Sequence, residues 1–252
     1  MKKAFCFIAT EDYLEGLKVL LYSLSLNFKN YNQYDKIVYS TSDVQINGVI
    51  NKLIKGDLPP YYWKFNLFME DYDRIIWMDS DMLCINDFSY IDNMDIQLGV
   101  CHSKTNVNNG MFSPVNAGFL IFGKQYLTEK WHSIFANDIR KKDMTSCFDQ
   151  ETVGRVLRGQ KCTYLSRDLN EEEFEKINDK TCILHWAKYY LLKPWVKDIG
   201  LFLKNKPWLD GHIDSKLMEK EQKLYIKLTQ NLKTGPNDIW NKYHDEMKGM
   251  SQ

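Results

Sequence analysis

The sequence predicts an α/β fold in which helices flank a single, mostly parallel sheet. Short apolar runs of strand length alternate with longer segments of helical spacing along most of the chain. One of these runs, Arg74–Met78, ends directly at two carboxylates, Asp79 and Asp81. Ligands of open α/β sheets bind at the carboxyl ends of the strands, so this run places a candidate site at the centre of the fold.

The first half of the chain begins like a Rossmann-like unit, with a strand, a polar turn and an amphipathic helix. Ala4–Ala9 is the strand, and helical spacing starts at Tyr13. The turn lacks Gly-x-Gly-x-x-Gly, which disfavours dinucleotide binding. Three further elements are expected before Arg74: a strand at Lys36–Ser40, a helix or irregular connector at Val44–Lys55, and a helix that starts at Pro59-Pro60 and carries Lys64.

The second half continues the alternation of strands and helices. Asn116-Ala117-Gly118 is interpreted as a small polar corner that opens into a buried strand. The acidic run Glu171–Glu173 is interpreted as the solvated start of a helix. The other expected elements are strands at Leu98–Cys101, Cys162–Leu165 and Thr181–Leu184, and helices at Gln125–Asn137 and Asp149–Leu157.

Two regions are expected along the 252 residues: a domain over residues 1–205 and a helical extension over residues 206–252. Leucines from Leu217 to Leu232 have the spacing of an amphipathic helix, which packs on the domain or forms a homodimer interface. Both interpretations remain open.

Composition narrows the class of function. Apolar residues make up 44% and charged residues 26%, and the formal net charge is zero, so there is no electrostatic case for nucleic acid or an anionic membrane as partner. The six cysteines are scattered and favour a reducing compartment. No apolar run reaches the length of a membrane span, and the N-terminus lacks the pattern of a signal peptide. We therefore expect a cytoplasmic protein.

Asp-x-Asp by itself carries little information, because a chain of this composition contains about two such triplets by chance. Two occur, Asp71-Tyr72-Asp73 and Asp79-Ser80-Asp81, and only the second closes an apolar strand. Two like charges at that position are costly without a cation between them. Hard oxygen donors favour Mg²⁺ or Mn²⁺, with a diphosphate as the third partner.

Polar residues also occur at the ends of three other expected elements: Asn116-Ala117-Gly118, Asp149-Gln150 and His185. In this order they resemble the family 8 glycosyltransferases of GT-A fold, the glycogenin and galactosyltransferase group. The resemblance extends from Ala4 to Trp195. It also includes the Thr10–Tyr13 turn, Lys64 ahead of the central strand, and Lys193-Pro194-Trp195 near the end.

The resemblance implies a role for each matched residue. Asp79, Asp81 and His185 would bind Mn²⁺, with Mg²⁺ as the alternative. Asp149, Gln150, Lys64 and Asn116 would act at the donor sugar, and a lysine of the closing segment at the diphosphate. Residues implied in donor binding are Thr10, Asp12, Tyr13, Lys64, Ser80, Asn116, Ala117, Gly118, Lys188 and Lys193. Tyr13 either contacts the uracil or packs in the core.

In the family closing segment, the Lys of Lys-Pro-Trp comes six positions after the metal histidine, and a Gly lies between them. Here eight positions separate His185 from Lys193, and no Gly lies among them. Lys188 and Lys193 are therefore both candidates for the phosphate contact. The segment from Leu169 to Leu184 contains no Tyr, so glycogenin-like self-glucosylation at that place is not supported.

The resemblance implies a retaining, Mn²⁺-dependent glycosyltransferase that moves a hexose from a UDP-sugar to a glycan or protein hydroxyl. Glucose is the first expectation for the hexose and galactose the second. One alternative is an inactive relative that binds UDP or sugar. Another is a metal-dependent nucleotidyltransferase, although the acidic Thr10–Tyr13 turn lacks the Gly-rich, basic character that a triphosphate favours.

Overall fold

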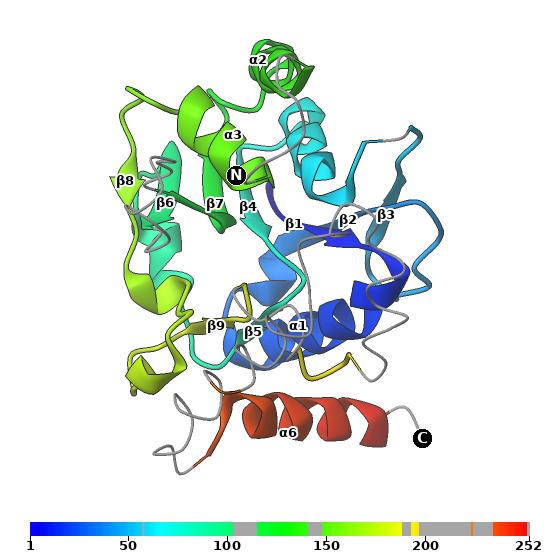
Figure 1. The fold of residues 1–252 in the computed structure, drawn as a ribbon. Helices are drawn as coiled ribbons and strands as arrows, with labels where there is room; N and C mark the ends of the chain where they lie inside the picture. Colours follow the sequence, from blue (N-terminus) through cyan, green and yellow to red (C-terminus); the bar gives the residue numbers. More distant parts are fainter. Residues whose placement is uncertain are drawn as a thin grey trace.

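The fold is built on a seven-stranded sheet with the strand order β3-β2-β1-β4-β7-β6-β8 (Figure 1). The computed structural model describes residues 1–56, 58–102, 115–140, 148–187, 193–196, 223 and 234–250. A second, small sheet pairs β5 (Met82–Cys84) with β9 (Ile183–His185). The strands of the large sheet are β1 (Lys3–Ala9), β2 (Tyr34–Ser40), β3 (Ile50–Leu53), β4 (Arg74–Met78), β6 (Leu98–His102), β7 (Val115–Gly123) and β8 (Thr163–Tyr164).

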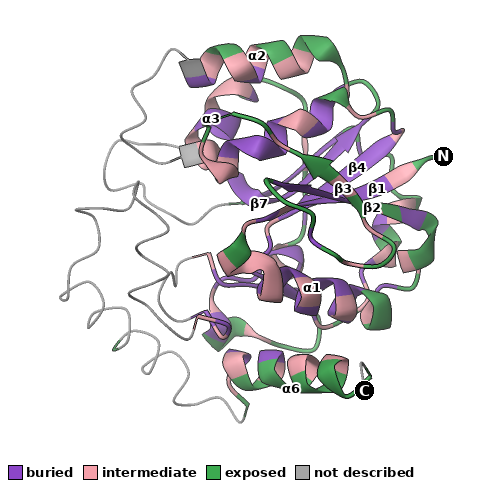
Figure 2. Cartoon of the chain, turned by 90° about the vertical axis from the view of Figure 1, so that its right-hand side faces the viewer, coloured by how far each residue is buried: buried purple, intermediate pink, exposed green. Residues whose placement is uncertain are grey.

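Helices cover both faces of the large sheet, which confirms the α/β class (Figures 1 and 2). On one face lies α1 (Leu14–Asn27), with α6 (Pro236–Gly249) packed outside it. The opposite face carries α2 (Glu129–Arg140), α3 (Phe148–Val156) and the long 3₁₀ helix η3 (Pro60–Met69). Shorter 3₁₀ helices are η1 (Glu11–Tyr13), η2 (Tyr31–Gln33), η4 (Ser89–Asn93), η5 (Arg167–Leu169) and η6 (Phe174–Lys176).

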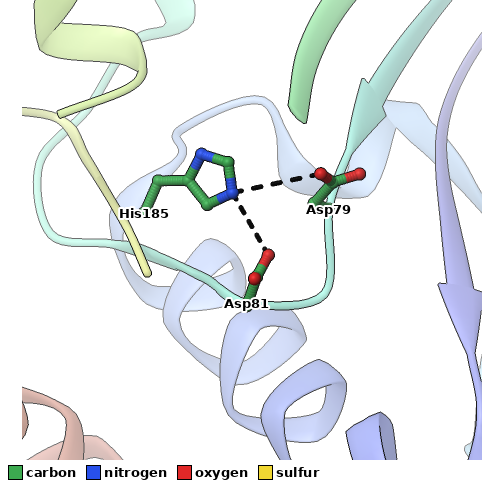
Figure 3. Close-up of side chains that lie close together, drawn as sticks. All are labelled: Asp79, Asp81 and His185. Carbon is green, nitrogen blue, oxygen red and sulfur yellow. Dashed lines mark ion pairs between the residues drawn. The ribbon is translucent and has the colours of Figure 1, made fainter. Parts of the chain in front are cut away.

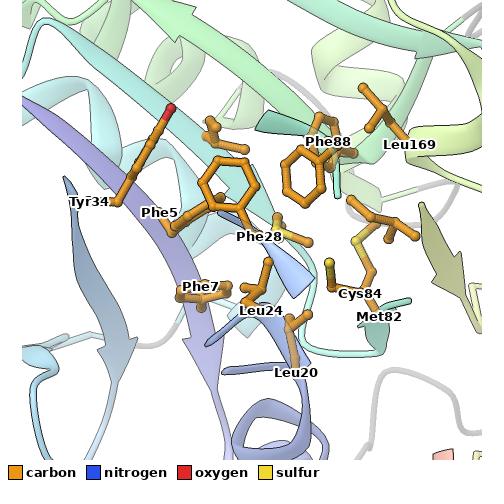
Figure 4. Packing of buried hydrophobic residues seen from close by; sticks show 14 of the residues in the cluster. Phe5, Phe7, Leu20, Leu24, Phe28, Tyr34, Met82, Cys84, Phe88 and Leu169 are labelled. Carbon is orange, nitrogen blue, oxygen red and sulfur yellow. The ribbon is translucent and has the colours of Figure 1, made fainter. Parts of the chain in front are cut away.

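Alternating side chains of the central strands fill a core on each face, because successive strand residues point in opposite directions. On β1, Phe5 and Phe7 pack toward α1, whereas Ala4 and Cys6 pack toward η3. Figure 4 shows the core beside α1, where Phe5 packs edge-on against Phe28 with ring centroids 5.3 Å apart. The apolar face predicted for the first helix is confirmed, since its leucines are buried there: Leu17, Leu20, Leu21 and Leu24.

Strand β7 runs antiparallel to its neighbours β4 and β6, and the other six strands of the large sheet share one direction. The start of β7 therefore lies beside the end of β4, with Met78 opposite Phe119. Asn116, Ala117 and Gly118 belong to β7 itself, so the expected polar corner is wrong. This reversal brings the polar start of β7 to the same edge as Asp79.

The small β5–β9 sheet extends the fold beyond the end of β4. Its two strands run antiparallel, with Met82 opposite His185. The predicted strand Thr181–Leu184 is present as β9, but it lies in this small sheet and starts at Ile183. Apolar residues from α1, the small sheet and α6 form a third cluster here: Val19, Leu83, Phe174, Leu184, Trp186, Trp195 and Trp240.

The C-terminal helix α6 packs on α1 (Figure 1). Trp240 is buried at the contact, and the Tyr243 hydroxyl lies 2.9 Å from Asn27 Nδ2, which donates to it. The expected helix over Leu217–Leu232 lies outside the described residues, and the boundary at residue 205 stays a prediction. Within the described part of the chain, none of the helices combines the length and the apolar character needed to cross a bilayer.

Several predicted elements differ from the structure in type or extent. Val44–Lys55 is neither a helix nor a connector throughout, because an irregular stretch leads into strand β3 at the sheet edge. The helix after Pro59-Pro60 is a 3₁₀ helix, and the helix expected from Gln125 begins at Glu129. The acidic run at residues 171–173 does precede a helix, with Glu173 as the N-cap of η6, but Glu171 and Glu172 are buried rather than solvated.

Candidate functional site

The triplet Asp79-Ser80-Asp81 is the junction between the two sheets. Asp79 follows β4, and its N–H donates to the Gly118 carbonyl at 2.9 Å. Asp81 precedes β5, and its carbonyl accepts the N–H of Trp186 at 3.0 Å. Between them, the Ser80 hydroxyl donates to the Ile8 carbonyl of β1. Both sheets therefore fix the backbone of the triplet.

Three side chains converge at this junction (Figure 3). Ligand atoms of Asp79, Asp81 and His185 all lie within 4.8 Å of one another. His185 Nε2 is 3.2 Å from Asp81 Oδ1 and 3.9 Å from Asp79 Oδ2. The Asp79 side chain is 32% exposed, whereas that of His185 is 2% exposed. The cluster is thus reached from solvent on the Asp79 side.

His185 is oriented by its other ring nitrogen. Nδ1 lies 2.7 Å from Asn170 Oδ1, and with Nδ1 as the donor the Nε2 lone pair points toward the two carboxylates. Nε2 itself is buried and makes no hydrogen bond of good geometry among the described residues. A Cβ on Gly118 would lie 2.4 Å from His185 Cε1, so this position needs a residue without a side chain.

The donor set fits a divalent cation. Two carboxylates and one imidazole nitrogen are a ligand set that Mn²⁺ accepts, while Mg²⁺ prefers oxygen alone. The buried, unbonded Nε2 beside the carboxylates is the feature of this structure that a bound cation would satisfy. No cluster of three or more such ligands is found elsewhere among the described residues.

Lys193 is the first of two buried cations at the site. Burial disfavours the charged form of Asp81, but Lys193 and His185 together outweigh it and lower the pKa of that carboxyl well below its usual range. Lys193 Nζ donates to Asp81 Oδ2 and, at 3.1 Å, to the Trp186 carbonyl. For His185, burial lowers the pKa of the imidazole, but the nearby carboxylates, Asp81 foremost, outweigh burial and raise that pKa above its usual value.

A short turn holds Lys193 in place. The Val196 N–H donates to the Lys193 carbonyl at 3.0 Å, and Trp195 packs against Trp240 with ring centroids 5.7 Å apart. Gly16 on α1 leaves room for this turn, since a Cβ there would lie 2.9 Å from the Ser80 carbonyl and 3.0 Å from the Trp195 ring. Lys188, the other candidate for the phosphate contact, lies outside the described residues.

Lys64 is the second buried cation, and it is 1% exposed. Its Nζ lies 3.3 Å from Asp79 Oδ1, pairs closely with Asp149, and donates to the Ala117 carbonyl at 2.9 Å. Burial lowers the pKa of Lys64, but Asp149 and Asp79 together raise it above its ordinary value. Burial also raises the pKa of Asp149, and the ammonium of Lys64 only partly reverses this. Lys64 thus links η3, β4, β7 and α3.

Asn116 uses both ends of its amide within the protein. Its Oδ1 accepts the Gly118 N–H at 2.7 Å, and its Nδ2 donates to Glu172 Oε1. Glu172 is 7% exposed and Glu171 is 3% exposed, so the expectation that the acidic run is solvated is wrong for these two residues. The partner of Glu172 is 56 positions away in the sequence, and the pairing of Glu171 with Arg167, four positions before it, is a spacing that solvated residues share, so no local signal marks the two glutamates as buried.

The predicted nucleotide-binding residues surround the same edge of the sheet. Thr10 Oγ1 donates to Asp12 Oδ1 at 2.6 Å, in the turn after β1. Tyr13 packs edge-on against Trp195 with ring centroids 6.0 Å apart, and Lys193 Nζ lies 5.4 Å from the Tyr13 ring centroid. Gln150 lies in the first turn of α3, next to Asp149. The structure therefore gathers these residues around the end of β4.

The charge of the site favours a cation as well. Four carboxylates lie here: Asp79, Asp81, Asp149 and Glu172. Among the described residues, two lysines pair with them, so these four negative charges less two positive ones leave a formal charge of −2 while His185 is neutral. A divalent cation balances that charge.

No protein-family model matches this sequence, and no curated protein matches it. Solved structures do match its fold. Glycosyltransferase GlyE of Streptococcus pneumoniae aligns over 100% of this chain with a TM-score of 0.64 at 15% identity, and this chain spans 64% of the GlyE chain. Galactosyltransferase LgtC, solved with donor and acceptor sugar analogues, aligns over 86% of this chain and 99% of its own with a TM-score of 0.61 at 14% identity.

The bifunctional glycosyltransferase WbbM aligns over 77% of this chain and 47% of its own, with a TM-score of 0.56 at 15% identity. These structures share their GT-A fold with this chain. The fold expected from the sequence is thereby confirmed.

Proposed function

We propose that this chain is a metal-dependent glycosyltransferase that uses a UDP-sugar as donor. The observation that carries the proposal is the Asp79, Asp81 and His185 cluster at the end of β4, flanked by two buried lysines. Its two carboxylates and the buried His185 Nε2, which makes no hydrogen bond among the described residues, suit a divalent cation, for which Mn²⁺ is our first choice. The likeness in fold to GlyE and LgtC supports the reaction class.

The chemistry proposed at this site is stabilisation of charge on a departing nucleoside diphosphate. Mn²⁺, when bound, would supply a Lewis acid at the diphosphate oxygens. Lys193 adds a positive charge on the Asp81 side, within 5.4 Å of the Tyr13 ring centroid, where we place the nucleotide. Lys64 adds a second charge on the Asp79 side, next to Asp149. The leaving group is thus flanked by cations on both sides.

Asp149 and Gln150 are the proposed residues at the donor sugar and the acceptor. Lys64 holds the Asp149 carboxylate, which would orient donor and acceptor hydroxyls. An amide such as Gln150 is a poor nucleophile, so we propose that the acceptor attacks the donor from the side of the leaving group, with retention of configuration. Trapping a glycosyl adduct on Asp149 or Gln150, detected by mass spectrometry, contradicts this mechanism.

The substrates follow as proposals from the resemblance and the fold. We propose a hexose as the transferred sugar, glucose first and galactose second, and a hydroxyl of a glycan or protein as the acceptor. LgtC was solved with donor and acceptor sugar analogues, which supports a sugar acceptor. A homodimer formed through the C-terminal region is a further expectation.

Release of UDP from a panel of UDP-sugars tests this function. Reactions are run with Mn²⁺ and, separately, with EDTA, and with simple sugars as acceptors. We expect Mn²⁺-dependent release from one donor and none from Asp81→Asn. The matched control is Asp71→Asn, an exposed carboxylate in the other Asp-x-Asp triplet, which should retain wild-type release. Mn²⁺-dependent UDP binding without release from any donor, with every acceptor tried, contradicts turnover and favours a binding protein.

A further inference from the structure

A short extended segment, residues 170–172, lies directly against β9 behind the candidate metal site. The Glu171 N–H donates to the Ile183 carbonyl at 2.9 Å, and the His185 N–H donates to the Glu171 carbonyl at 3.0 Å. Glu171 also pairs with Leu184 as a parallel bridge. The segment therefore has a fixed register relative to His185.

Successive side chains of this segment point to opposite sides of its backbone. In extended backbone, residues two apart point to the same side. Asn170 and Glu172 both face His185, with Asn170 Oδ1 at 2.7 Å and Glu172 Oε1 at 3.8 Å from its Nδ1. Glu171, between them, turns away and pairs with Arg167 at 2.8 Å.

Asn170 determines how the imidazole of His185 points. It is 4% exposed, and the oxygen it presents to Nδ1 directs Nε2 at the carboxylates of Asp79 and Asp81. Hydrogen bonds of this kind fix the ring orientation of a metal-binding histidine. Asn170 has no direct contact with either carboxylate among its described interactions, so its effect acts through His185.

Glu172 determines how the amide of Asn116 points. A carboxylate only accepts hydrogen bonds, so the atom of Asn116 that faces Glu172 Oε1 is the Nδ2 donor. The Oδ1 of Asn116 then faces the Gly118 N–H at 2.7 Å. The same Glu172 oxygen also places a negative charge 3.8 Å from His185 Nδ1.

We propose that Asn170 and Glu172 are positioning residues, which hold the His185 ring and the Asn116 amide in the orientations used for metal and donor binding. This inference rests on the proposed function. The two residues of this acidic segment have different roles. Asn170 acts on the metal ligand His185, and Glu172 acts on the donor side of the site.

Substitutions at Asn170 test its part of the proposal through metal binding. Asn170→Leu removes the acceptor, and Asn170→Asp keeps an oxygen at the same place. Mn²⁺ affinity is measured by electron paramagnetic resonance of the free ion, and ligation by His185 from the ¹⁴N coupling in electron spin echo spectra. We expect Asn170→Leu to weaken Mn²⁺ binding about 10- to 100-fold and to lose the ¹⁴N coupling. Asn170→Asp should restore both.

Glu173→Gln is the matched control, because Glu173 directly follows the segment but pairs with Arg167 and Lys176. It should retain the wild-type Mn²⁺ affinity and ¹⁴N coupling. If Asn170→Leu folds cooperatively and keeps the wild-type ¹⁴N coupling, Asn170 does not have the proposed role. Absence of Mn²⁺ binding or ¹⁴N coupling in the wild-type protein instead contradicts the proposed metal site, so the two failures are distinguishable.

Substitutions at Glu172 test its part through donor kinetics. Glu172→Leu removes the acceptor of the Asn116 amide, and Glu172→Gln keeps an oxygen that can accept the same hydrogen bond. We expect Glu172→Leu to raise the KM for the donor about 10-fold, with a smaller change in Mn²⁺ affinity, and Glu172→Gln to stay within about 3-fold of wild type. Equal donor KM values for wild type and Glu172→Leu overturn this role.

Discussion

The two carboxylates of Asp79-Ser80-Asp81 belong to different parts of the molecule, although only one residue separates them. Asp79 ends β4 of the large sheet and shares Lys64 with Asp149. Asp81 begins the small sheet and faces Lys193 and His185. Each half of the site therefore has its own buried lysine and its own structural support.

We expect the two lysines to have separable tasks. The Lys64 half is built from η3, β4, β7 and α3 around the acidic group proposed at the sugar. The Lys193 half is built from β5, β9 and the turn that follows them, and it contains two of the three metal ligands. Substitutions in the Lys193 half should therefore weaken metal or donor binding, and substitutions in the Lys64 half should mainly slow turnover.

The largest effect is expected at Asp81, which joins the metal cluster to Lys193. Asp81→Asn keeps the shape of the side chain but removes a charged ligand. We expect transfer to fall about 1,000-fold, which corresponds to about 4 kcal/mol of transition-state stabilisation, and Mn²⁺ binding to weaken in parallel. Donor turnover and Mn²⁺ titration check this. Near-wild-type transfer with Mn²⁺ disproves the metal assignment.

Asp81→Ala tests how much the buried pair of Asp81 and Lys193 contributes to stability. This variant leaves the Lys193 ammonium buried without its carboxylate, and removing one partner of a buried pair costs about 3–5 kcal/mol. We expect its free energy of unfolding to fall clearly below that of Asp81→Asn, whose side-chain oxygen still accepts a hydrogen bond from Lys193. Urea unfolding followed by circular dichroism measures the difference. If Asp81→Ala is as stable as the wild type, the Lys193 pair contributes little to stability.

Lys64→Met tests the half at the donor sugar. It removes the cation that lowers the pKa of Asp149, which burial already raises, so the carboxyl should ionise at a higher pH than in the wild type. We expect kcat to fall about 100-fold, while Mn²⁺ affinity changes little. The acidic limb of the pH profile of kcat should move to higher pH. A pH profile of kcat checks the direction. An acidic limb that moves to lower pH contradicts the assignment of Asp149.

Lys193→Met tests the half at the diphosphate. We expect the KM for the donor to rise about 10- to 100-fold, because a charge-assisted contact is lost. Mn²⁺ alone should bind at least as tightly, because the variant lacks a positive charge next to Asp81. Calorimetric titrations with Mn²⁺ and with UDP separate the two effects. Weaker binding of Mn²⁺ alone shows instead that Lys193 mainly supports the shape of the metal site.

Gly118→Ala should have the smallest effect of this series. The added Cβ would lie 2.4 Å from His185 Cε1, so the ring must shift, and we expect Mn²⁺ affinity to fall about 10-fold. Gly249→Ala is the control, because nothing lies within 4 Å of a Cβ at that helical position. Unchanged Mn²⁺ affinity in Gly118→Ala indicates that β7 adjusts without moving His185.

The Lys64 half could largely be predicted from the sequence. β4 is an apolar run long enough to be recognised, and its polar end marks Asp79 directly. Outside this half, the apolar face of α1 could also be predicted, from the spacing of its leucines. Lys64 itself was found through the family resemblance, since a lysine among aromatic residues carries no local sign of burial.

The Lys193 half could be predicted only in part. Strands β5 and β9 have three residues each, which is too short for a period of two to be recognised. The burial of Glu171 and Glu172 depends on Arg167 and on Asn116, and the latter is 56 positions away. A run of acidic residues gives no sign of such partners, and solvent exposure is its usual state.

A crystal structure with Mn²⁺ and UDP tests the central claim most directly, with anomalous scattering used to locate the manganese. We expect one anomalous peak bound by Asp79, Asp81 and His185 Nε2, and a UDP diphosphate in contact with both the metal and Lys193. Manganese bound elsewhere, or UDP bound away from this junction, contradicts the account that the two halves form one site for metal and donor.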